Sequence, residues 1–251
     1  MKIAILTGAS SGLGVQYARQ LHSVFPEIER VWLIARRQGR MEALAQELDL
    51  PADILPLDLC SETSIDALRE KLEAEKPEVQ LLINNAGCGF LGNVGEGELE
   101  KQTRMIDLNV RALTAITHVV LPYMPRGSHI LSTSSIASFC ANARLNTYSA
   151  TKAYVSSFTR GLSYELRPRG ITATAVCPGP MATEFVTVGN ITGNSPDFER
   201  LPYCDPQKVT LGALKAARAG KVFYTPTAFY RFYRVVAKVT PHALVVRWAK
   251  C

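Results

Sequence analysis

A tyrosine and a lysine at helical spacing are the residues of this sequence best suited to acid–base chemistry. Tyr148 and Lys152 are four positions apart, so on a helix their side chains lie on one face. A lysine ammonium favours the ionised form of a nearby phenol, whose ordinary pKa is about 10. We therefore expect a pKa for Tyr148 closer to neutrality, where the phenol could protonate an alkoxide or take the proton of an alcohol.

Two adjacent serines, Ser134 and Ser135, end an apolar run shortly before this pair. Either hydroxyl could donate to a substrate carbonyl, and the alternative for each is a bond to local backbone at the end of a strand. Tyrosine and lysine also occur at this spacing on helices by chance. The interpretation therefore depends on what else the chain places beside them.

Three glycines, Gly8, Gly12 and Gly14, follow the first apolar run of the chain. Backbone without side-chain bulk at the start of a helix accommodates a phosphate, because N–H groups and the helix dipole favour an anion there. The plain alternative is a tight turn between a strand and a helix. The spacing of these glycines differs from the common dinucleotide fingerprint GxGxxG.

Apolar β-prone runs alternate with helical patterns along nearly the whole chain. This predicts an α/β fold, a single doubly wound, Rossmann-like domain with helices on both faces of a seven-stranded parallel sheet. The expected strands are residues 3–7, 31–35, 54–57, 81–84, 129–133, 172–176 and 222–225, and the main helices are 14–22, 41–48, 65–75, 99–121 and 148–166. The three glycines then lie at the first strand–helix junction, where such folds bind dinucleotides.

Four segments occur in an order that is characteristic of one family. Residues 7–14 read TGxxxGxG, residues 84–87 read NNAG, residues 148–152 read YxxxK and residues 178–183 read PGxxxT. Over about residues 1–185 the chain resembles the short-chain dehydrogenase/reductase family. The resemblance implies hydride transfer between a nicotinamide cofactor and a carbonyl or alcohol.

By this resemblance the catalytic residues are Asn109, Ser135, Tyr148 and Lys152. Tyr148 is the acid–base group, Lys152 also donates to the nicotinamide ribose, and Asn109 supports a water relay. We select Ser135 over Ser134 as the donor to the carbonyl because it precedes Tyr148 by thirteen residues, the family's usual separation.

The second expected strand ends at Ala35-Arg36-Arg37, where a protein that prefers NAD usually has an acidic residue. A guanidinium suits the 2′-phosphate of NADP, so NADP(H) is favoured over NAD(H), although two solvated arginines are the structural alternative. Asp58 resembles the residue that accepts from the adenine amino group, and it could also cap the helix near Ser61. The expected cofactor-binding residues are Gly8, Ser10, Ser11, Gly12, Leu13, Gly14, Arg36, Arg37, Asp58, Leu59, Asn85, Ala86, Gly87, Tyr148, Lys152, Pro178, Gly179, Met181 and Thr183.

The substrate pocket is expected to be mostly apolar and closed by a lid. Residues 181–206 form an irregular insertion of the kind that often covers a site. Arg144 could meet a carboxylate or phosphate of the substrate, or stand solvated in a loop. The expected substrate-binding residues are Ser135, Cys140, Asn142, Arg144, Tyr148 and Phe185.

We therefore expect an NADP(H)-dependent enzyme that interconverts a secondary alcohol and a ketone, with a bulky apolar substrate such as a hydroxysteroid. A long-chain 3-oxoacyl group is the alternative substrate. A non-catalytic nucleotide-sensing protein is the rival from another class, but its sign would be the loss of Tyr148 or Lys152, and both are present. No histidine or cysteine spacing predicts a metal site.

The formal net charge of +6 is unevenly distributed along the chain. Residues 206–251 contain nine Lys or Arg and no carboxylate, whereas residues 1–205 contain 19 basic and 22 acidic residues. The body has no basic stripe, so we expect no nucleic-acid binding. Dispersed cysteines and the lack of a signal-peptide or membrane-spanning run predict a cytoplasmic protein.

The last residues form an extension, 227–251, to a cofactor-binding and catalytic domain of residues 1–226. A helix starting near residue 227 has an apolar face made by Phe229, Phe232, Tyr233 and Val236. Its opposite face is basic and is made by Arg231, Arg234 and Lys238. We favour an apolar face that covers the protein's own pocket or a partner subunit, and we expect a homo-oligomer, dimer or tetramer. Contact with an anionic membrane and completion of the core are the less favoured alternatives.

Overall fold

The computed structural model describes residues 1–191 and 200–248, and its centre is a sheet of seven parallel strands. The strands are β1 (Lys2–Thr7), β2 (Arg30–Ala35), β3 (Ala52–Pro56), β4 (Glu78–Asn84), β5 (His129–Thr133), β6 (Thr172–Val176) and β7 (Phe223–Tyr224). Their order across the sheet is β3-β2-β1-β4-β5-β6-β7. All seven strands coincide with the runs predicted from the sequence, within a few residues at their ends.

The chain reverses its direction of winding between β1 and β4, which are neighbours in the sheet. At such a point the crossovers leave in opposite directions, so a crevice opens beyond the carboxyl ends of the two strands. The central strands are apolar on both faces because helices cover both sides; Ile3, Ala4, Ile5 and Leu6 are completely buried.

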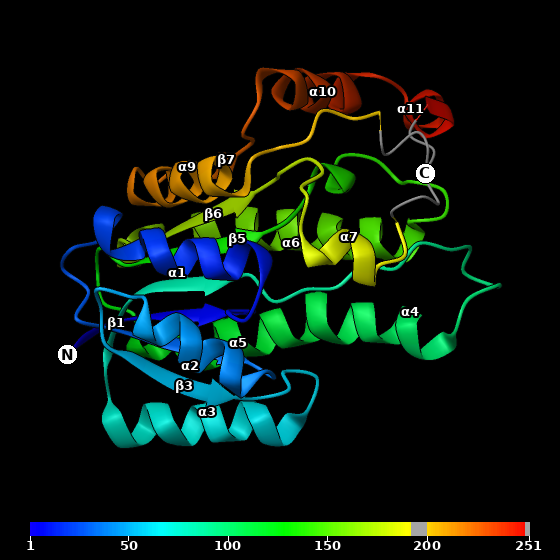
Figure 1. Ribbon diagram of the computed structural model, residues 1–251. Helices are drawn as coiled ribbons and strands as arrows, with labels where there is room; N and C mark the ends of the chain where they lie inside the picture. Colours follow the sequence, from blue (N-terminus) through cyan, green and yellow to red (C-terminus); the bar gives the residue numbers. More distant parts are fainter. Residues whose placement is uncertain (192–199, 249–251) are drawn as a thin grey trace.

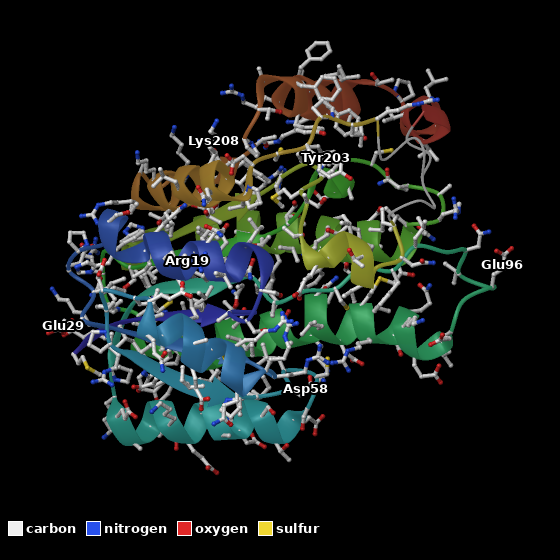
Figure 2. The ribbon with its side chains drawn as sticks, viewed as in Figure 1. Arg19, Glu29, Asp58, Glu96, Tyr203 and Lys208 are labelled. Atoms are coloured by element: carbon white, nitrogen blue, oxygen red, sulfur yellow. The ribbon has the colours of Figure 1, made fainter. Side chains whose placement is uncertain are left out.

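Two layers of helices enclose the sheet (Figure 1). On one face α1 (Gly12–Val24), α2 (Gln38–Gln46) and α9 (Pro206–Arg218) contribute buried side chains such as Tyr17, Met41 and Leu214 to one core. On the other face α3 (Glu62–Glu75), α5 (Leu113–Val120) and α6 (Asn146–Glu165) contribute to a second core. Charged side chains such as Arg19 and Glu29 lie outside both cores (Figure 2).

Residues 99–121 are helical, as predicted, but the type of helix changes along the segment. It consists of α4 (Leu99–Ile106), a π-helical segment η1 (Asp107–Ala112) and α5, followed by the 3₁₀ turn η2 (Leu121–Tyr123). π turns are rare and often occur at functional sites. Here the segment carries Asn109, which is almost completely buried. Two more 3₁₀ turns, η3 (Ile136–Ser138) and η4 (Arg167–Arg169), flank α6.

Three further helices lie at the carboxyl-end side of the sheet: α7 (Glu184–Val188), α10 (Ala228–Val239) and α11 (His242–Trp248). The predicted lid, 181–206, therefore contains the short helix α7, and its residues 192–199 lie outside the described residues. Within the described part of the chain, no helix combines the length and apolar character needed to span a bilayer.

Candidate active site

A cavity of about 790 Å³ opens at the carboxyl ends of the strands. Its walls come from the turns after β1 to β6 and from α7, α10 and α11, so segments from the whole length of the chain meet there. Every predicted cofactor-binding residue lines this cavity except Gly14. A cavity of this size is typical of sites for cofactors and small molecules.

The glycine turn after β1 has the geometry of a phosphate cradle. Gly8 and Gly12 have φ angles of +70° and +54°, which favour glycine. A Cβ on Gly14 would lie 2.0 Å from the Gly8 carbonyl oxygen, so Gly14 lets α1 pack against the turn instead of facing the cavity. No acidic residue occupies the first turn of α1 and the Ser11 side chain does not cap it, so the N–H groups there suit an anion. The turn therefore fits the pyrophosphate of a dinucleotide.

The NNAG segment is bonded to the same turn through Thr7. The Thr7 hydroxyl accepts from the backbone amides of Asn85 and Ala86, both at 3.0 Å, and donates to the Ile83 carbonyl at 3.2 Å. A Cβ on Gly8 would lie 2.9 Å from the Ala86 Cα, so the two turns are in close contact. The ends of β1 and β4 are thereby fixed relative to each other at the crevice.

Arg37, after β2, connects the glycine turn to α7. Its guanidinium donates to the Ser10 hydroxyl at 3.1 Å and to the carboxylate of Glu184, the first residue of α7, at 2.9 Å. Arg40 pairs with the same carboxylate, and hydrogen bonds from Arg40 and Arg37 lower the pKa of Glu184. Glu184 lines the cavity but was not predicted, because 147 residues separate it from Arg37 and no spacing in the sequence reveals the contact.

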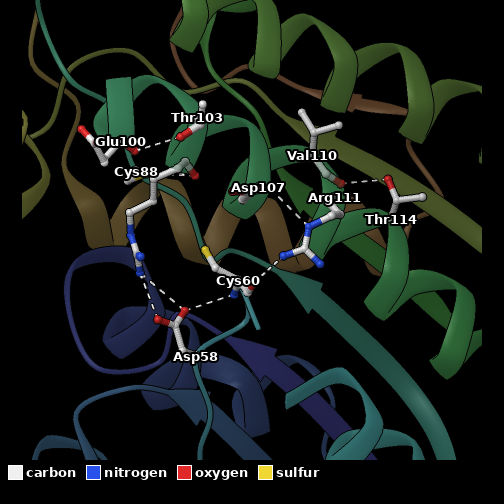
Figure 3. Close-up of polar contacts among 10 residues, drawn as sticks. Asp58, Cys60, Cys88, Glu100, Thr103, Asp107, Val110, Arg111 and Thr114 are labelled. Carbon is white, nitrogen blue, oxygen red and sulfur yellow. Dashed lines mark hydrogen bonds and ion pairs between the residues drawn. The ribbon is translucent and has the colours of Figure 1, made fainter. Parts of the chain in front are cut away.

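Asp58 lies at the end of β3, where Figure 3 shows its polar contacts. Its carboxylate accepts from the Cys60 amide at 3.1 Å and pairs with Arg104 of α4 at 3.3 Å. Partial burial raises the pKa of Asp58, but these two partners outweigh it and the net shift is downward. The alternative role as a cap of α3 is wrong, because the capping position is Ser61 and the Asp58 side chain bonds Cys60 instead. Arg104 was not predicted, although it also lines the cavity.

Three of the four predicted catalytic residues, Ser135, Tyr148 and Lys152, line the cavity. Tyr148 and Lys152 are 8% and 5% exposed, and the Ser135 side chain lies close enough to the phenol to act on its pKa. The Ser135 hydroxyl also accepts from the Ala137 amide at 3.1 Å, as the cap of η3. Ser134 does something different: its hydroxyl donates to the Lys152 carbonyl at 2.8 Å and contacts Ser156. Of the two serines, Ser135 acts on the pKa of Tyr148, whereas the Ser134 hydroxyl is engaged by Lys152 and Ser156.

The pKa of Tyr148 does not move in the direction that the sequence suggested. Burial raises it to about 12, and the hydrogen bond with Ser135 offsets only part of this effect. The Lys152 Nζ donates to the Thr133 carbonyl at 2.8 Å and lies 5.7 Å from the centroid of the phenol ring. Burial lowers the pKa of Lys152 itself to about 8. The expected shift of the Tyr148 pKa toward neutrality is therefore wrong, because desolvation raises this pKa and the effect that lowers it comes from Ser135 and not from Lys152.

Asn109 is placed behind the site and does not line the cavity. Its amide donates to the Cys88 carbonyl at 2.8 Å and to the Thr151 hydroxyl at 3.0 Å, and its oxygen accepts from the Cys88 amide at 2.9 Å. A Cβ on Gly87 would lie 3.1 Å from this oxygen and 3.3 Å from the Lys152 Nζ. Asn109 therefore ties the irregular segment after NNAG to α6, the helix that carries Tyr148.

The end of the cavity near Tyr148 is largely apolar. Phe185 packs on Tyr148 with ring centroids 5.4 Å apart, and a Cβ on Gly89 would lie within 2.8 Å of both rings. Gly89 was not predicted; its role depends on a contact among three separate segments. Among the predicted substrate-binding residues, Ser135, Asn142, Tyr148 and Phe185 line the cavity.

Cys140 and Arg144 do not line the cavity. Cys140 is buried against Ala237 and Val245 beneath the C-terminal helices. Arg144 has a left-handed backbone, with φ of +64°, and its carbonyl accepts from the Gly92 amide at 2.7 Å. Both residues therefore shape the neighbouring loops in this structure. Among the described residues, no group of three or more histidine, cysteine or carboxylate side chains could hold a metal ion.

Comparisons with known proteins agree with this geometry. The family model for short chain dehydrogenases matches residues 2–191. An uncharacterized oxidoreductase of Staphylococcus saprophyticus is 31% identical over 221 residues, which are 86% of this chain and 90% of that protein.

Two solved structures share the fold over almost their whole length. A short-chain dehydrogenase from Sphingobium yanoikuyae in complex with NADPH is 26% identical, with a TM-score of 0.80, and the match covers 95% of this chain and 93% of that one. The 3-ketoacyl-(acyl-carrier-protein) reductase from Brucella melitensis, complexed with NADH, is also 26% identical, with a TM-score of 0.75 and 89% and 96% coverage. The family model covers most of the chain, so this protein is an oxidoreductase of the short-chain dehydrogenase family.

Proposed function

We propose that this protein is an NADP(H)-dependent oxidoreductase that interconverts a secondary alcohol and a ketone. The observation that carries the proposal is the buried phenol of Tyr148, which lines the cavity together with Ser135 and lies one helical turn from Lys152. A buried phenol that keeps its proton at neutral pH is a suitable acid for a developing alkoxide.

In the direction of reduction, Ser135 and Tyr148 both donate hydrogen bonds to the substrate oxygen, which polarises the carbonyl. A bound reduced nicotinamide supplies the hydride to the carbonyl carbon. Tyr148 then releases its proton to the alkoxide oxygen as that charge develops. Lys152, held by the Thr133 carbonyl beside the phenol, uses its remaining N–H groups on ribose hydroxyls. Asn109 positions the Cys88 backbone and does not contact the substrate directly.

The proposed preference for NADP(H) rests on the cations that follow β2. Arg36 and Arg37 line the cavity at the end of β2, and neither residue after the strand is acidic. The guanidinium of Arg37 is oriented by Ser10 of the glycine turn, the segment that would hold the pyrophosphate. The Sphingobium relative was solved with NADPH, whereas the Brucella relative was solved with NADH. The relatives thus support a nicotinamide nucleotide, and the arginines favour the phosphorylated form.

For the substrate we propose a bulky apolar ketone or alcohol, with a hydroxysteroid as the model compound. Phe185, Leu145 and Phe90 line the end of the cavity near Tyr148, and α10 and α11 extend its apolar wall. A 3-oxoacyl thioester is the second candidate, favoured by the likeness to the Brucella reductase.

A screen of ketones and secondary alcohols tests activity, cofactor and substrate class together. Purified protein is incubated with NADPH or NADH and each ketone, or with the oxidised nucleotides and each alcohol, and absorbance of the reduced nicotinamide is followed. We expect turnover of apolar cyclic ketones with NADPH. Faster turnover of 3-oxoacyl thioesters would establish the second candidate, and tight nucleotide binding with no turnover of any compound would contradict a catalytic function.

A further inference from the structure

The C-terminal helix α10 has two opposite apolar sides with different surroundings. On one side Tyr230 and Ala237 are 0% and 2% exposed. A Cβ on Gly179 would lie 2.2 Å from the Tyr230 ring, and the Tyr230 hydroxyl donates to the Pro202 carbonyl at 2.7 Å. This side fixes α10 to the PGxxxT segment of the cofactor site.

The other side of α10 is apolar and exposed. Phe232, Val235 and Val239 are 70%, 59% and 74% exposed, and their spacing of three and four residues places them along one stripe. None of the three lines the cavity. The expectation that this face covers the protein's own pocket therefore holds for Phe229, Tyr233 and Val236, which line the cavity, and not for the stripe.

Cations border this stripe. Arg231 and Lys238 are exposed on α10, and Lys208 projects from α9 on the same side of the molecule (Figure 2). Arg234 departs from the predicted basic face, because it stacks on the Phe223 ring with its guanidinium carbon 3.9 Å from the centroid. The segment 206–251, which contains α9, α10 and α11, has no carboxylate at all. A second copy would bring another set of cations against the same stripe, whereas an anionic surface complements it.

We propose that the exposed face of α10 docks on an anionic lipid bilayer. Phe232, Val235 and Val239 enter the boundary between headgroups and acyl chains, and Arg231 and Lys238 contact lipid phosphates. Phe229 and Leu244 are 52% and 49% exposed and also line the cavity, so they mark its mouth beside the docking face. An apolar substrate dissolved in the bilayer would enter there; this part of the proposal rests on the proposed function.

Vesicle binding tests the docking without any need for turnover. The purified full chain is sedimented with vesicles of phosphatidylcholine alone or mixed about equally with phosphatidylglycerol. We expect binding to the mixed vesicles that weakens at high salt, and a loss of about tenfold or more for the double variant Phe232→Ser/Val239→Ser. Arg231→Gln/Lys238→Gln should lose about tenfold or more on mixed vesicles.

Two matched variants serve as controls. Val94→Ser/Leu99→Ser removes exposed apolar side chains far from α10, and Arg69→Gln/Lys101→Gln removes exposed cations of α3 and α4; both should bind like the parent. No binding of the parent to mixed vesicles, or equal losses in the controls, would overturn the proposal. It would also be overturned if light scattering found a dimer that Phe232→Ser/Val239→Ser dissociates, since the face would then belong to self-association.

A kinetic comparison of two ketones tests substrate access separately from vesicle binding. With a long-chain apolar ketone carried in mixed vesicles, kcat/KM of Phe232→Ser/Val239→Ser should fall about tenfold, whereas a short water-soluble ketone should be reduced as by the parent. An equal rate on the vesicle-borne ketone would exclude bilayer access. Failure with both ketones would instead count against the proposed function, while vesicle binding would still decide the docking.

Discussion

At the scale of single residues, the site is governed by how completely the protein removes Tyr148 and Lys152 from water. Desolvation moves the two pKa values apart, up for the phenol to about 12 and down for the amine to about 8. Ser135 offsets the shift of Tyr148 through a hydrogen bond. The phenol of Tyr148 therefore keeps its proton at neutral pH until an alkoxide develops beside it and accepts that proton.

Replacement of that proton donor should remove catalysis and leave nucleotide binding intact. We expect Tyr148→Phe to lower kcat by about 10²- to 10⁴-fold, because the ring remains and only the proton donor is lost. Steady-state rates and a nucleotide fluorescence titration measure the two effects. Tyr154→Phe is the matched control, because Tyr154 also lies on α6 but its hydroxyl bonds Thr114 of α5, outside the cavity. Near-normal turnover of Tyr148→Phe would refute the acid–base role.

The direction of the Tyr148 shift predicts opposite pH profiles for the two reaction directions. Alcohol oxidation needs the phenolate, whose fraction rises about tenfold per pH unit below the pKa of about 12, so kcat/KM for oxidation should climb from pH 7 to 10. Ketone reduction needs the phenol, which keeps its proton over this range, so Tyr148 causes no decline there. A bell-shaped oxidation profile with its maximum near pH 7 would contradict the raised pKa.

At the scale of elements, the turn after β2 and the start of α7 are held by one carboxylate between two arginines. Arg37 and Arg40 both bond Glu184, so a 2′-phosphate that binds Arg37 competes with part of this contact. The ion pair between Arg37 and Glu184 thus couples the end of β2 to the start of α7.

Charge at the end of β2 should decide between the two nucleotides. Arg36→Asp with Arg37→Ala should weaken NADPH about 100-fold or more and NADH only a few-fold, because charge-assisted hydrogen bonds to the 2′-phosphate exist only for NADPH. Glu184→Gln should act in the opposite sense and favour NADPH, since it leaves Arg37 without its competing carboxylate. Fluorescence titration gives the dissociation constants; equal losses for the two nucleotides would remove the 2′-phosphate argument.

The attachment of α10 should contribute strongly to the free energy of unfolding. Tyr230→Ala removes a fully buried ring that packs on Gly179 and should cost about 3–5 kcal/mol, or roughly 10 °C in Tm. Tyr230→Phe keeps the ring and should cost about 1 kcal/mol for the lost bond to Pro202. Thermal unfolding by circular dichroism measures both, and a Tm for Tyr230→Ala within a degree of the parent would show that α10 is loosely attached.

At the scale of the whole molecule, the site draws on both helical layers and on the turns after β1 to β6 at the carboxyl edge of the sheet. A ligand that binds there bridges segments that are distant in sequence, so it should stabilise the fold as a unit. NADP⁺ at 100 times its dissociation constant should add about 2.7 kcal/mol and raise Tm by about 5–10 °C. The shift should shrink in Arg36→Asp/Arg37→Ala at the same nucleotide concentration; no shift in the parent would contradict nucleotide binding.

Much of this arrangement could be predicted from local patterns. Apolar runs bounded by turn residues identify the strands. The glycines at 8, 12 and 14 indicate the phosphate turn, because positive φ angles at Gly8 and Gly12 and a close backbone contact at Gly14 each favour glycine. Arg104 and Glu184 could not be predicted, because their roles arise where distant segments meet. The pKa of Tyr148 was predicted in the wrong direction for a related reason: helical spacing reports a neighbouring amine but not the depth of burial.

The π-helical segment between α4 and α5 has one more consequence, for the rotational phase of the long helix. A π turn holds one residue more than an α turn, so the two flanking helices are out of step by about 100°. This offset lets Met105 of α4 pack with Leu145 and Tyr148 while Ile116 of α5 faces the sheet. Deletion of a single residue within 107–112 would restore the regular repeat and turn Met105 away from Tyr148, so the geometry around Tyr148 depends on the number of residues in this segment.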